Sequence, residues 1–511
     1  MQYGLLVSLL AMMLATVQAE DALYAGLPFL DKPTTVKDVL ILREPPPGYE
    51  PATTEEEWDS IFRDNLFPDL QPYTSWVVKK GRPMGLSRLA TQILALQSST
   101  AANRLAVVVL RGGRCYRALP TGIEHVLKLR VDSCLEELCS GAARLGLRLP
   151  DTVFVFNPYD TPVCRLVGGC WVPVFSMHKR YDWALKRSLD SDVLFPHMGH
   201  RFDRLVFFPW TAKDKRGLLR ASMQARMSPS CTRVALANLS ASPRGAPYLD
   251  CGFVRNYRED FHMPQTFMRP YVGLSKHARY RFLLNADGHV SSSRLGYIMQ
   301  INSVVLKERS PWLEYYYRSL QPGGHVIEYS ADTILDLMKQ YDDPARDAEL
   351  RALANASQHF AAKYLTPEGK VRYAVRALQE YSRLFTGMGD FVRGIKGLLE
   401  APAAADEEVE EENGGREGAK GRGKGKRSDD EDEDGVEGGG GEGQDGNGGG
   451  DGGAGEKGRS FLLGRGRAAR DGGEATGHWT PGRVRRAELL EAIRSQVTVR
   501  RRRRQGGKSN E

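Results

Sequence analysis

The chain has 511 residues and carries 71 lysines and arginines against 63 aspartates and glutamates, which gives a net charge of +8. Just over half of the glycines, 28 of 54, follow residue 400, so the part able to bury a core runs from about residue 20 to 400, long enough for two domains. A charge of this size, with both signs crowded into the tail, does not indicate nucleic-acid binding, and no nucleic-acid partner is expected.

An apolar run, Leu5–Ala15, opens the chain and is followed by Val17-Gln18-Ala19. Ala19, with Val17 two positions before it, fits a secretory signal peptide over residues 1–19 that is cleaved after Ala19. The alternative is an uncut signal that anchors the chain to the membrane. In both cases the body of the protein is expected to face the lumen of the endoplasmic reticulum or Golgi, and secretion also stays open.

Seven cysteines follow no zinc-binding spacing. In an oxidising lumen some of them should pair, and the odd count leaves at least one free or intermolecular. The sequence does not define the pairing. Two sequons, which begin at Asn238 and Asn355, permit N-glycosylation but do not establish it.

From residue 20 to 400 the hydrophobic pattern alternates between helical and strand-like segments. Helical spacing predicts helices over Glu55–Phe67, Gly85–Leu96, Ile123–Gly146, Ala331–Gln340, Ala345–Tyr364 and Arg372–Leu399. Short apolar runs predict strands over Leu105–Leu110, Thr152–Asn157, Val172–Phe175, Leu205–Phe208, Arg281–Asn285, Ser303–Leu306 and Val326–Tyr329. This alternation predicts an α/β fold with parallel sheets.

The stretch from Lys276 to Tyr329 has the features of a phosphate site. The strand Arg281–Asn285 stops at the turn Asp287-Gly288, and Ser291–Ser293 then precede an apolar-periodic run. Serines suit a helix start, where backbone N–H groups lack partners and favour an anion. Arg294 adds a fixed positive charge with a fork of donors.

The same stretch resembles the protein O-glucosyltransferase family, also called the capsule-associated (CAP) glycosyltransferases. The matching positions, in order, are Arg279, Tyr280, Arg281, Phe282, Leu283, Asn285, Gly288, Arg294, Ser303, Val305, Glu314, Tyr317, Leu320, Pro322 and His325. Gly323-Gly324 stands where the family usually has tryptophan and one more residue. The resemblance covers about residues 150 to 385 well and the earlier part weakly.

The resemblance implies the two Rossmann-like lobes of the GT-B glycosyltransferase architecture. We place an N-terminal acceptor-side lobe at residues 20–190, a C-terminal nucleotide-sugar lobe at 191–370 and closing helices at 371–399. The implied activity is inverting, metal-independent transfer of glucose or xylose from a UDP-sugar to a hydroxyl of a protein serine or a glycan. No cofactor beyond the UDP-sugar donor is implied.

Asp160 is the candidate catalytic base. It follows the predicted strand Thr152–Asn157, and ligands in open α/β sheets bind at the carboxyl ends of strands. Asp160-Thr161-Pro162 resembles the family's catalytic Asp-X-Pro, whose carboxylate takes the proton of the acceptor hydroxyl. Read from the residues alone, an aspartate before a proline is commonly a turn residue.

The donor side is expected to hold the departing diphosphate, whose growing negative charge needs donors. Arg220-Ala221-Ser222 resembles the family's Arg-Gly-Ser, and Arg233 resembles a second phosphate-binding arginine, with Arg226 as a rival. The nucleotide-sugar residues expected from the sequence and the resemblance are Ser222, Arg233, Gly288, Ser291, Ser292, Ser293, Arg294, Glu314, Phe195 and Pro196. Structural roles for Arg233, Glu314 and His325 stay open.

Asp190-Ser191-Asp192 has the form of the Asp-X-Asp motif that chelates Mn²⁺ or Mg²⁺ in the other transferase fold, GT-A. Its surroundings match the metal-free family, so we interpret it as a solvated loop and expect no metal.

Residues 400–511 are expected to be a disordered tail, because this glycine-rich, acidic and then basic sequence lacks apolar residues for a core. A marginal amphipathic helix over Arg485–Val497 is the exception considered. Two other functions stay open: a catalytically inactive nucleotide-sugar or glycan-binding relative, supported by Ala221 and Gly323-Gly324, and an interaction protein acting through its Gly/Arg-rich tail.

Overall fold

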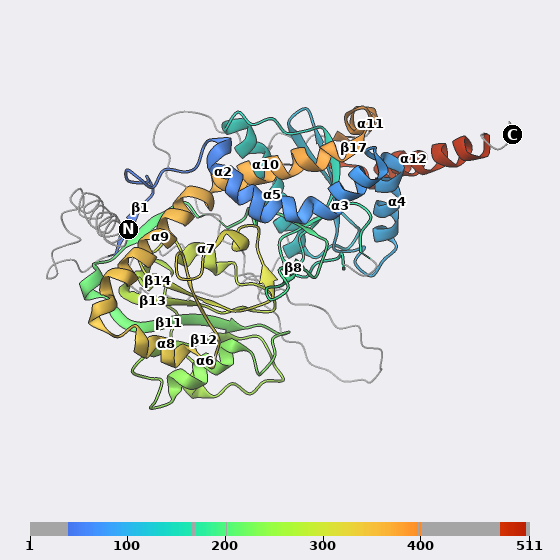
Figure 1. Ribbon diagram of the computed structural model, residues 1–511. Helices are drawn as coiled ribbons and strands as arrows, with labels where there is room; N and C mark the ends of the chain where they lie inside the picture. The colour runs from blue at the N-terminus through green and yellow to red at the C-terminus, as the bar shows by residue number, and fades with distance from the viewer. Residues whose placement is uncertain (1–38, 166–168, 201, 397, 400–480, 507–511) are drawn as a thin grey trace, which may run out of the picture. The chain divides into compact units, whose positions relative to one another are not determined.

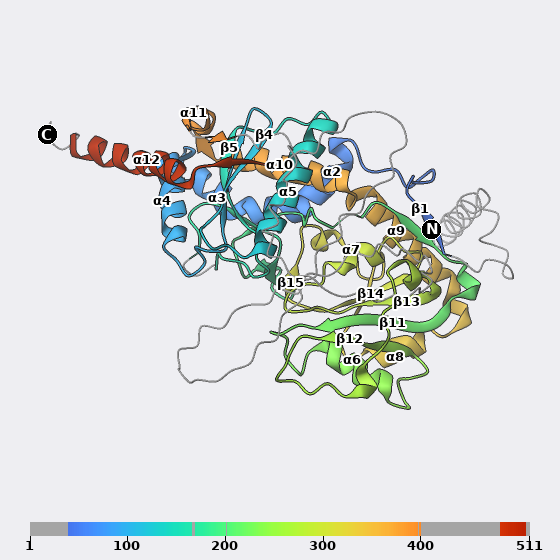
Figure 2. The same cartoon turned by 180° about the vertical axis from the view of Figure 1, so that it is seen from behind.

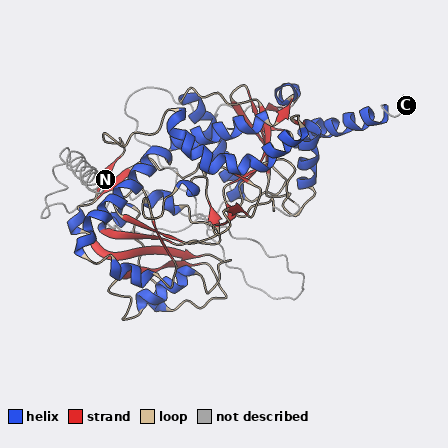
Figure 3. Cartoon of the chain, in the orientation of Figure 1, coloured by secondary structure: helices blue, strands red, loops and turns tan. Residues whose placement is uncertain are grey.

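The computed structural model describes residues 39–506, apart from 166–168, 201, 397 and 400–480. The predicted signal peptide at 1–19 and most of the predicted tail lie outside these residues. The described part is a mixed α/β fold in which two sheets are flanked by helices (Figure 3). None of its helices combines the length and apolar character that a membrane crossing requires.

The first sheet has seven strands in the order β18-β19-β4-β3-β5-β6-β9. Its centre is antiparallel, because β3 pairs with β4 and β5 in opposite directions, whereas β5, β6 and β9 run parallel. Gly112 and Gly113, with φ of 58° and 79°, form the tight turn between β3 and β4, which requires left-handed backbone at both positions. The strands are β3 (Ala106–Arg111), β4 (Arg114–Ala118), β5 (Thr152–Asn157), β6 (Val174–Ser176), β9 (Val193–Leu194), β18 (Leu398–Leu399) and β19 (Gly482–Val484).

Helices from both ends of the chain pack around the first sheet. Helix α10 lies against α5, although more than two hundred residues separate them in sequence (Figure 1). The Tyr381 hydroxyl on α10 donates to the Val153 carbonyl oxygen of β5 at 2.9 Å, which ties this late helix to the sheet. The helices are α2 (Glu55–Ile61), α3 (Phe67–Lys80), α4 (Leu86–Gln97), α5 (His125–Arg144), α10 (Pro367–Arg383) and α11 (Met388–Gly394), and a π-helical turn, Phe62–Leu66, joins α2 to α3.

The second sheet is entirely parallel, with five strands in the order β12-β11-β13-β14-β16. Apolar side chains from α6, α8 and α9 fill the core against it, as expected for buried parallel strands. Its strands are β11 (Asp214–Met223), β12 (Leu249–Asn256), β13 (Tyr280–Asn285), β14 (Val304–Glu308) and β16 (Ile327–Tyr329). Its helices are α6 (Thr232–Ala241), α7 (Arg294–Ile298), α8 (Ile334–Gln340) and α9 (Asp347–Tyr364).

Short strands complete the described fold outside the two main sheets. The run predicted as a strand at Leu205–Phe208 does form one, but it pairs with the N-terminal β1 in a separate two-stranded sheet. The bounds are β1 (Leu40–Leu42), β2 (Met84–Gly85), β7 (Lys179–Asp182), β8 (Arg187–Ser188), β10 (Leu205–Phe207), β15 (Trp312–Leu313) and β17 (Phe385–Thr386).

The C-terminal end of the chain corrects one prediction. Strand β19 pairs with β4 and β18. Helix α12 (Arg486–Gly506) packs against α4, as both views show (Figures 1 and 2). Leu489 and Ile493 of α12 are buried. The expectation that residues 400–511 are a disordered tail is therefore wrong for residues 482–506, where the helix considered over Arg485–Val497 is present.

The first sheet also extends past the expected lobe boundary at residue 190, because β9 is its edge strand. The expectation that some cysteines pair is confirmed. Cys115–Cys139 and Cys164–Cys170 are disulfides, while Cys134, Cys231 and Cys251 are free thiols.

Candidate active site

Asp160 lies three residues beyond the end of β5, at the carboxyl ends of the parallel strands β5, β6 and β9. Its Oδ1 accepts a hydrogen bond from Arg130 Nη1 of α5 at 2.7 Å, and about 30% of its side chain is exposed. Burial alone would raise the pKa of this carboxyl group, but the charge of Arg130 and its hydrogen bond hold the pKa below the usual value. The carboxylate is therefore ionised and accessible, as proton acceptance requires.

His178 connects this edge of the first sheet to the second sheet. It follows β6, it is buried, and its Nδ1 lies 2.5 Å from the Ser291 Oγ in the loop after β13. Burial lowers the pKa of His178 to about 4, against the opposing charge of Asp160, so the imidazole is neutral near pH 7. The carboxyl ends of the two sheets thus meet at this hydrogen bond.

The loop between β13 and α7 is held by hydrogen bonds from its backbone N–H groups to two carboxylate side chains. The Asp287 N–H donates to Glu308 Oε2 at 2.7 Å, and the Ser292 N–H donates to Asp287 Oδ1 at 3.1 Å. A Cβ on Gly288 would lie 2.4 Å from Gln224 Oε1, so a larger residue there would displace the Gln224 side chain that holds the loop. The structure places Gly288 at a tight approach between the ends of β11 and β13.

His289 brings the same loop toward Asp160. Its backbone N–H donates to Gln224 Oε1 at 2.9 Å, which fixes its position. Burial lowers the pKa of its half-buried imidazole, while the charge of Asp160 opposes this shift. The Asp160 carboxylate, which follows a strand of the first sheet, thus acts electrostatically on the His289 imidazole in a loop of the second.

Three arginines reach this edge of the second sheet. Arg233 of α6 is buried and holds the backbone, because its Nε donates to the Ala286 carbonyl oxygen at 3.1 Å and its Nη1 to that of Ser222 at 2.9 Å. Arg226 is exposed, and its Nη1 donates at 2.7 Å to the hydroxyl of Tyr159, the residue that precedes Asp160 in the chain. Arg233, buried against the loop, and Arg226, on the surface, thus both lie at this edge of the second sheet.

Arg294 is the third arginine. It is the first residue of α7, and its Nη1 donates to the carbonyl oxygen of Arg220 in β11. Ser222 follows a bulge at the end of β11, whereas the Ala221 side chain lies in the core. The methyl group that replaces the family's glycine therefore points away from the ligand side of the strand.

The predicted serine cap corresponds only in part to the structure. Helix α7 has five residues, and Ser293 precedes it without donating or accepting a side-chain capping bond. Ser291 and Ser292 are buried, and the Ser291 hydroxyl is engaged by His178. The site is therefore built from loop backbone and side chains rather than from a capped helix terminus.

Glu314 lies buried beside this loop and accepts a hydrogen bond from the Tyr317 hydroxyl at 3.2 Å. Burial raises the pKa of Glu314 to about 7, against the charge of Lys370 and hydrogen bonds from Tyr317 and Ser293. The Glu314 carboxyl group is therefore almost fully buried and lies next to Ser293.

Phe195 does not present its ring to a ligand. The ring is 1% exposed and packs among three phenylalanines of the first sheet, with centroid distances of 5.3 Å to Phe175, 5.8 Å to Phe156 and 6.4 Å to Phe154. Pro196 is buried as well. His325 is held by tilted ring packing against Phe360 and by accepting the Gln321 N–H, which is a structural role.

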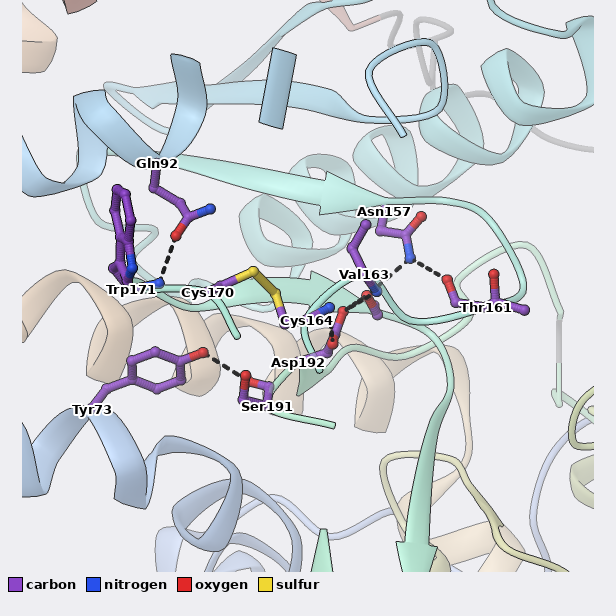
Figure 4. Close-up of a disulfide and its surroundings, with 11 residues drawn as sticks. Tyr73, Gln92, Asn157, Thr161, Val163, Cys164, Cys170, Trp171, Ser191 and Asp192 are labelled. Atoms are coloured by element: carbon purple, nitrogen blue, oxygen red, sulfur yellow. Dashed lines mark hydrogen bonds between the residues drawn. A yellow bond between two sulfur atoms is a disulfide. The ribbon is translucent and has the colours of Figure 1, made fainter. Parts of the chain in front are cut away.

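The interpretation of Asp190-Ser191-Asp192 as a solvated loop is wrong. Asp190 is buried and paired with Arg180, and Asp192 accepts hydrogen bonds from the backbone N–H groups of Val163 and Cys164 at 3.0 and 2.7 Å (Figure 4). Asp192 therefore anchors the start of the loop closed by the Cys164–Cys170 disulfide, and Asp190 anchors Arg180 of β7. Within the described ranges, no group of three His, Cys, Asp or Glu side chains is arranged to hold a metal ion.

Sequence reasoning missed Arg130, His178 and His289, which surround Asp160. A weak signal existed for the two histidines, because each directly follows a predicted strand and its turn. For Arg130 no local signal exists, since it is one of several charged residues on an amphipathic helix.

Residues 208–405 match the family model described as Glycosyl transferase family 90. This segment belongs to glycosyl transferase family 90, and the chain is a distant relative of the protein O-glucosyltransferases. It is 25% identical over 301 residues to Protein O-glucosyltransferase 1 of Rattus norvegicus, a match covering 52% of this chain and 71% of that protein.

Two further relatives agree with this family 90 assignment. The chain is 24% identical over 291 residues to Protein O-glucosyltransferase 1 of Homo sapiens, covering 50% of this chain and 69% of that protein. It is 27% identical over 176 residues to Protein O-glucosyltransferase 2 of Danio rerio, covering 34% of each. The crystal structure of Anabaena HepE in complex with UDP-glucose is 8% identical, with a TM-score of 0.24, over 32% of this chain and 48% of that one.

Proposed function

We propose that this family 90 protein is an inverting, metal-independent transferase that moves glucose or xylose from a UDP-sugar to a hydroxyl group. The observation that carries the proposal is the meeting of the two sheets at their carboxyl ends, where the hydrogen bond between His178 Nδ1 and Ser291 Oγ spans 2.5 Å. Ligands of parallel α/β sheets bind at such edges. Asp160 stands on one side of this junction and Arg226, Arg233 and Arg294 on the other.

Asp160 is the proposed base. As the acceptor oxygen attacks the anomeric carbon from the face opposite the diphosphate, the Asp160 carboxylate takes the hydroxyl proton. One C–O bond forms, the bond from the anomeric carbon to the diphosphate oxygen breaks, and the configuration inverts. Arg130 keeps Asp160 ionised and oriented, because its Nη1 holds Oδ1 at 2.7 Å and leaves Oδ2 for the acceptor.

The leaving UDP carries the charge released by bond breaking. Exposed Arg226 and the Arg294 guanidinium are the proposed partners of the diphosphate, since fixed donors placed where charge develops stabilise the transition state. Arg233 and Gly288 position the loop that carries the proposed donor-side serines. Ser222, Ser291, Ser292, Ser293 and Glu314 complete the proposed donor side.

The acceptor is proposed to be a serine of a glycoprotein or a glycan hydroxyl in the lumen of the secretory pathway. The two disulfides support an oxidising compartment, because such bonds persist there and are rare in the cytosol. The relatives' names support O-glucosylation as the first activity to test.

The test measures UDP release from UDP-glucose and UDP-xylose with the full chain and Asp160→Asn, and UDP affinity by calorimetry. We expect Asp160→Asn to keep UDP affinity within about twofold and to lose about 10²–10⁴-fold in turnover, the range of a general base. Arg226→Ala should instead weaken UDP binding. The matched control is Asp336→Asn, an exposed aspartate of α8 outside this cluster.

Two outcomes would count against the proposal. Normal turnover by Asp160→Asn would remove Asp160 as the base. Tight UDP binding without turnover by the unaltered chain, over both donors and with peptide and glycan acceptors, would identify the protein as a non-catalytic nucleotide-sugar-binding relative.

A further inference from the structure

A pocket of about 350 Å³ lies where the chain passes between the two sheets. It is lined by α5, by residues 202–205, and by the turn Thr366–Glu368 between α9 and α10. Helix α9 packs on strand β14 of the second sheet and α10 packs on α5 beside the first, so both connections between the sheets border the pocket. None of the proposed donor or base residues lines it.

Six charged side chains line this junction pocket, and their charges balance. The three positive and three negative residues are Arg43, Arg144, Arg204, Glu137, Asp203 and Glu368. Their ion pairs are long: Arg144 lies 3.7 Å from Glu137 and 3.8 Å from Glu368, and Arg204 lies 3.6 Å from Asp203. These distances exceed those of hydrogen bonds, so the donors and acceptors of these groups are available to a ligand.

Balanced guanidinium and carboxylate groups suit hydroxyl groups, each of which both donates and accepts a hydrogen bond. The absence of net charge gives no advantage to a diphosphate or another anion. Leu42, Pro45 and Pro367 add apolar surface, so the lining combines apolar contacts with a few directed polar groups, as ligand pockets do.

We propose that the junction pocket binds a neutral saccharide of one or two sugar rings, at a site separate from the nucleotide-sugar site. Such a ligand would contact α5, beside the first sheet, and α9, beside the second, at once. It therefore stabilises one relative placement of these elements over others, because a ligand favours the arrangement in which it makes more contacts.

Lys370 gives the junction pocket a physical connection to the proposed active site. Its Nζ donates to the carbonyl oxygen of His197 at 2.9 Å and to that of His200. The charges of Glu314 at the active site and of Glu137 and Asp203 at the pocket all act on this one buried ammonium group. Hydrogen bonds from sugar hydroxyls to Glu137 and Asp203 would therefore change the electrostatic environment of Lys370 and, through Lys370, that of Glu314.

The test uses the full chain saturated with UDP, so that the proposed nucleotide-sugar site is occupied and no turnover is needed. Glucose, xylose and maltose are the probes, and binding is followed by saturation-transfer difference NMR over millimolar concentrations. We expect saturable binding of at least one probe, weakened about tenfold by Arg144→Ala or Glu137→Gln, the loss expected for a hydrogen bond to a charged group. The matched control is Arg63→Ala, which removes an exposed arginine of another long ion pair.

Melting curves of each variant separate loss of a contact from loss of folding. Binding that survives both pocket substitutions, binding that UDP abolishes, or no saturable binding of any probe by a folded chain would each overturn the assignment. Because no transfer is measured, an inactive protein that still binds saccharide in this way would refute the proposed function and leave the pocket assignment intact.

Discussion

Residues 482–506 are predicted to stabilise the first sheet, and truncation after residue 479 tests this directly. Leu489 and Ile493 of α12 are 0% and 1% exposed, and β19 forms pairs with both β4 and β18. Full burial of a leucine or isoleucine side chain contributes roughly 1.5–3 kcal/mol. The two side chains therefore supply about 3–6 kcal/mol in gross terms, part of which is offset by ordering the segment.

The matched control is an internal deletion of residues 402–479. Because β18 and β19 are antiparallel, with Leu399 opposite Arg483, the deletion leaves Glu400, Ala401, Thr480, Pro481 and Gly482 as a five-residue connection between paired residues. A hairpin loop of this length is ordinary. The internal deletion is longer than the truncation, yet it keeps every described element.

We expect the truncated chain to melt at a lower temperature and to lose hydrogen-exchange protection in β4 and α4, the elements covered by β19 and α12. The internal deletion should retain the melting temperature and this protection. Equal melting temperatures and equal protection of β4 in the two deletions would refute the reasoning, because they would mean that the docked segment contributes no net stability.

Three further predictions concern the proposed site. Arg130→Ala should raise the pKa of Asp160, because it removes the positive charge that lowers this pKa. The acidic limb of the kcat/KM profile should then move to higher pH, and an unmoved limb would mean that another group sets it. Gly288→Ala should weaken UDP binding, because the added Cβ would lie 2.4 Å from Gln224 Oε1. The double variant Gly288→Ala, Gln224→Ala should recover part of the lost affinity. Wild-type affinity of the single variant by calorimetry would contradict this prediction. Glu314 has a folded pKa raised from 4.5 to about 7, so the folded state binds more protons and its stability falls as pH rises through this window; Glu314→Gln should flatten that fall in a melting series, and an unchanged slope would assign it to other groups.

Strands with continuous apolar runs were predictable from local sequence. Thr152–Asn157 forms β5 with the predicted bounds, and β13 differs from Arg281–Asn285 by one residue. Both are buried, and a run of apolar and β-branched side chains indicates this directly. Because Asp160 follows β5, its place at a sheet edge was predictable too.

Features that depend on distant partners were not predictable in this way. Strand β19 is only three residues in a glycine- and arginine-rich segment, and its partner β4 lies far earlier in the chain. The burial of Asp190 and Asp192 depends on Arg180 and on backbone N–H groups, which no local pattern reports. Arg130 and His178 reach the site by the same kind of non-local packing.

The layer of helices around the first sheet has a consequence for biosynthesis. The second sheet is formed by one continuous stretch, from β11 to β16, so it can fold while the chain is still being made. The first sheet needs α10, β18 and β19, which are translated after the whole of the second sheet. Since translation proceeds at roughly 5–20 residues per second, the earlier strands wait tens of seconds for their late partners. A chaperone that binds the nascent chain would therefore meet this protein with its N-terminal part exposed, and the half made first is the half completed last.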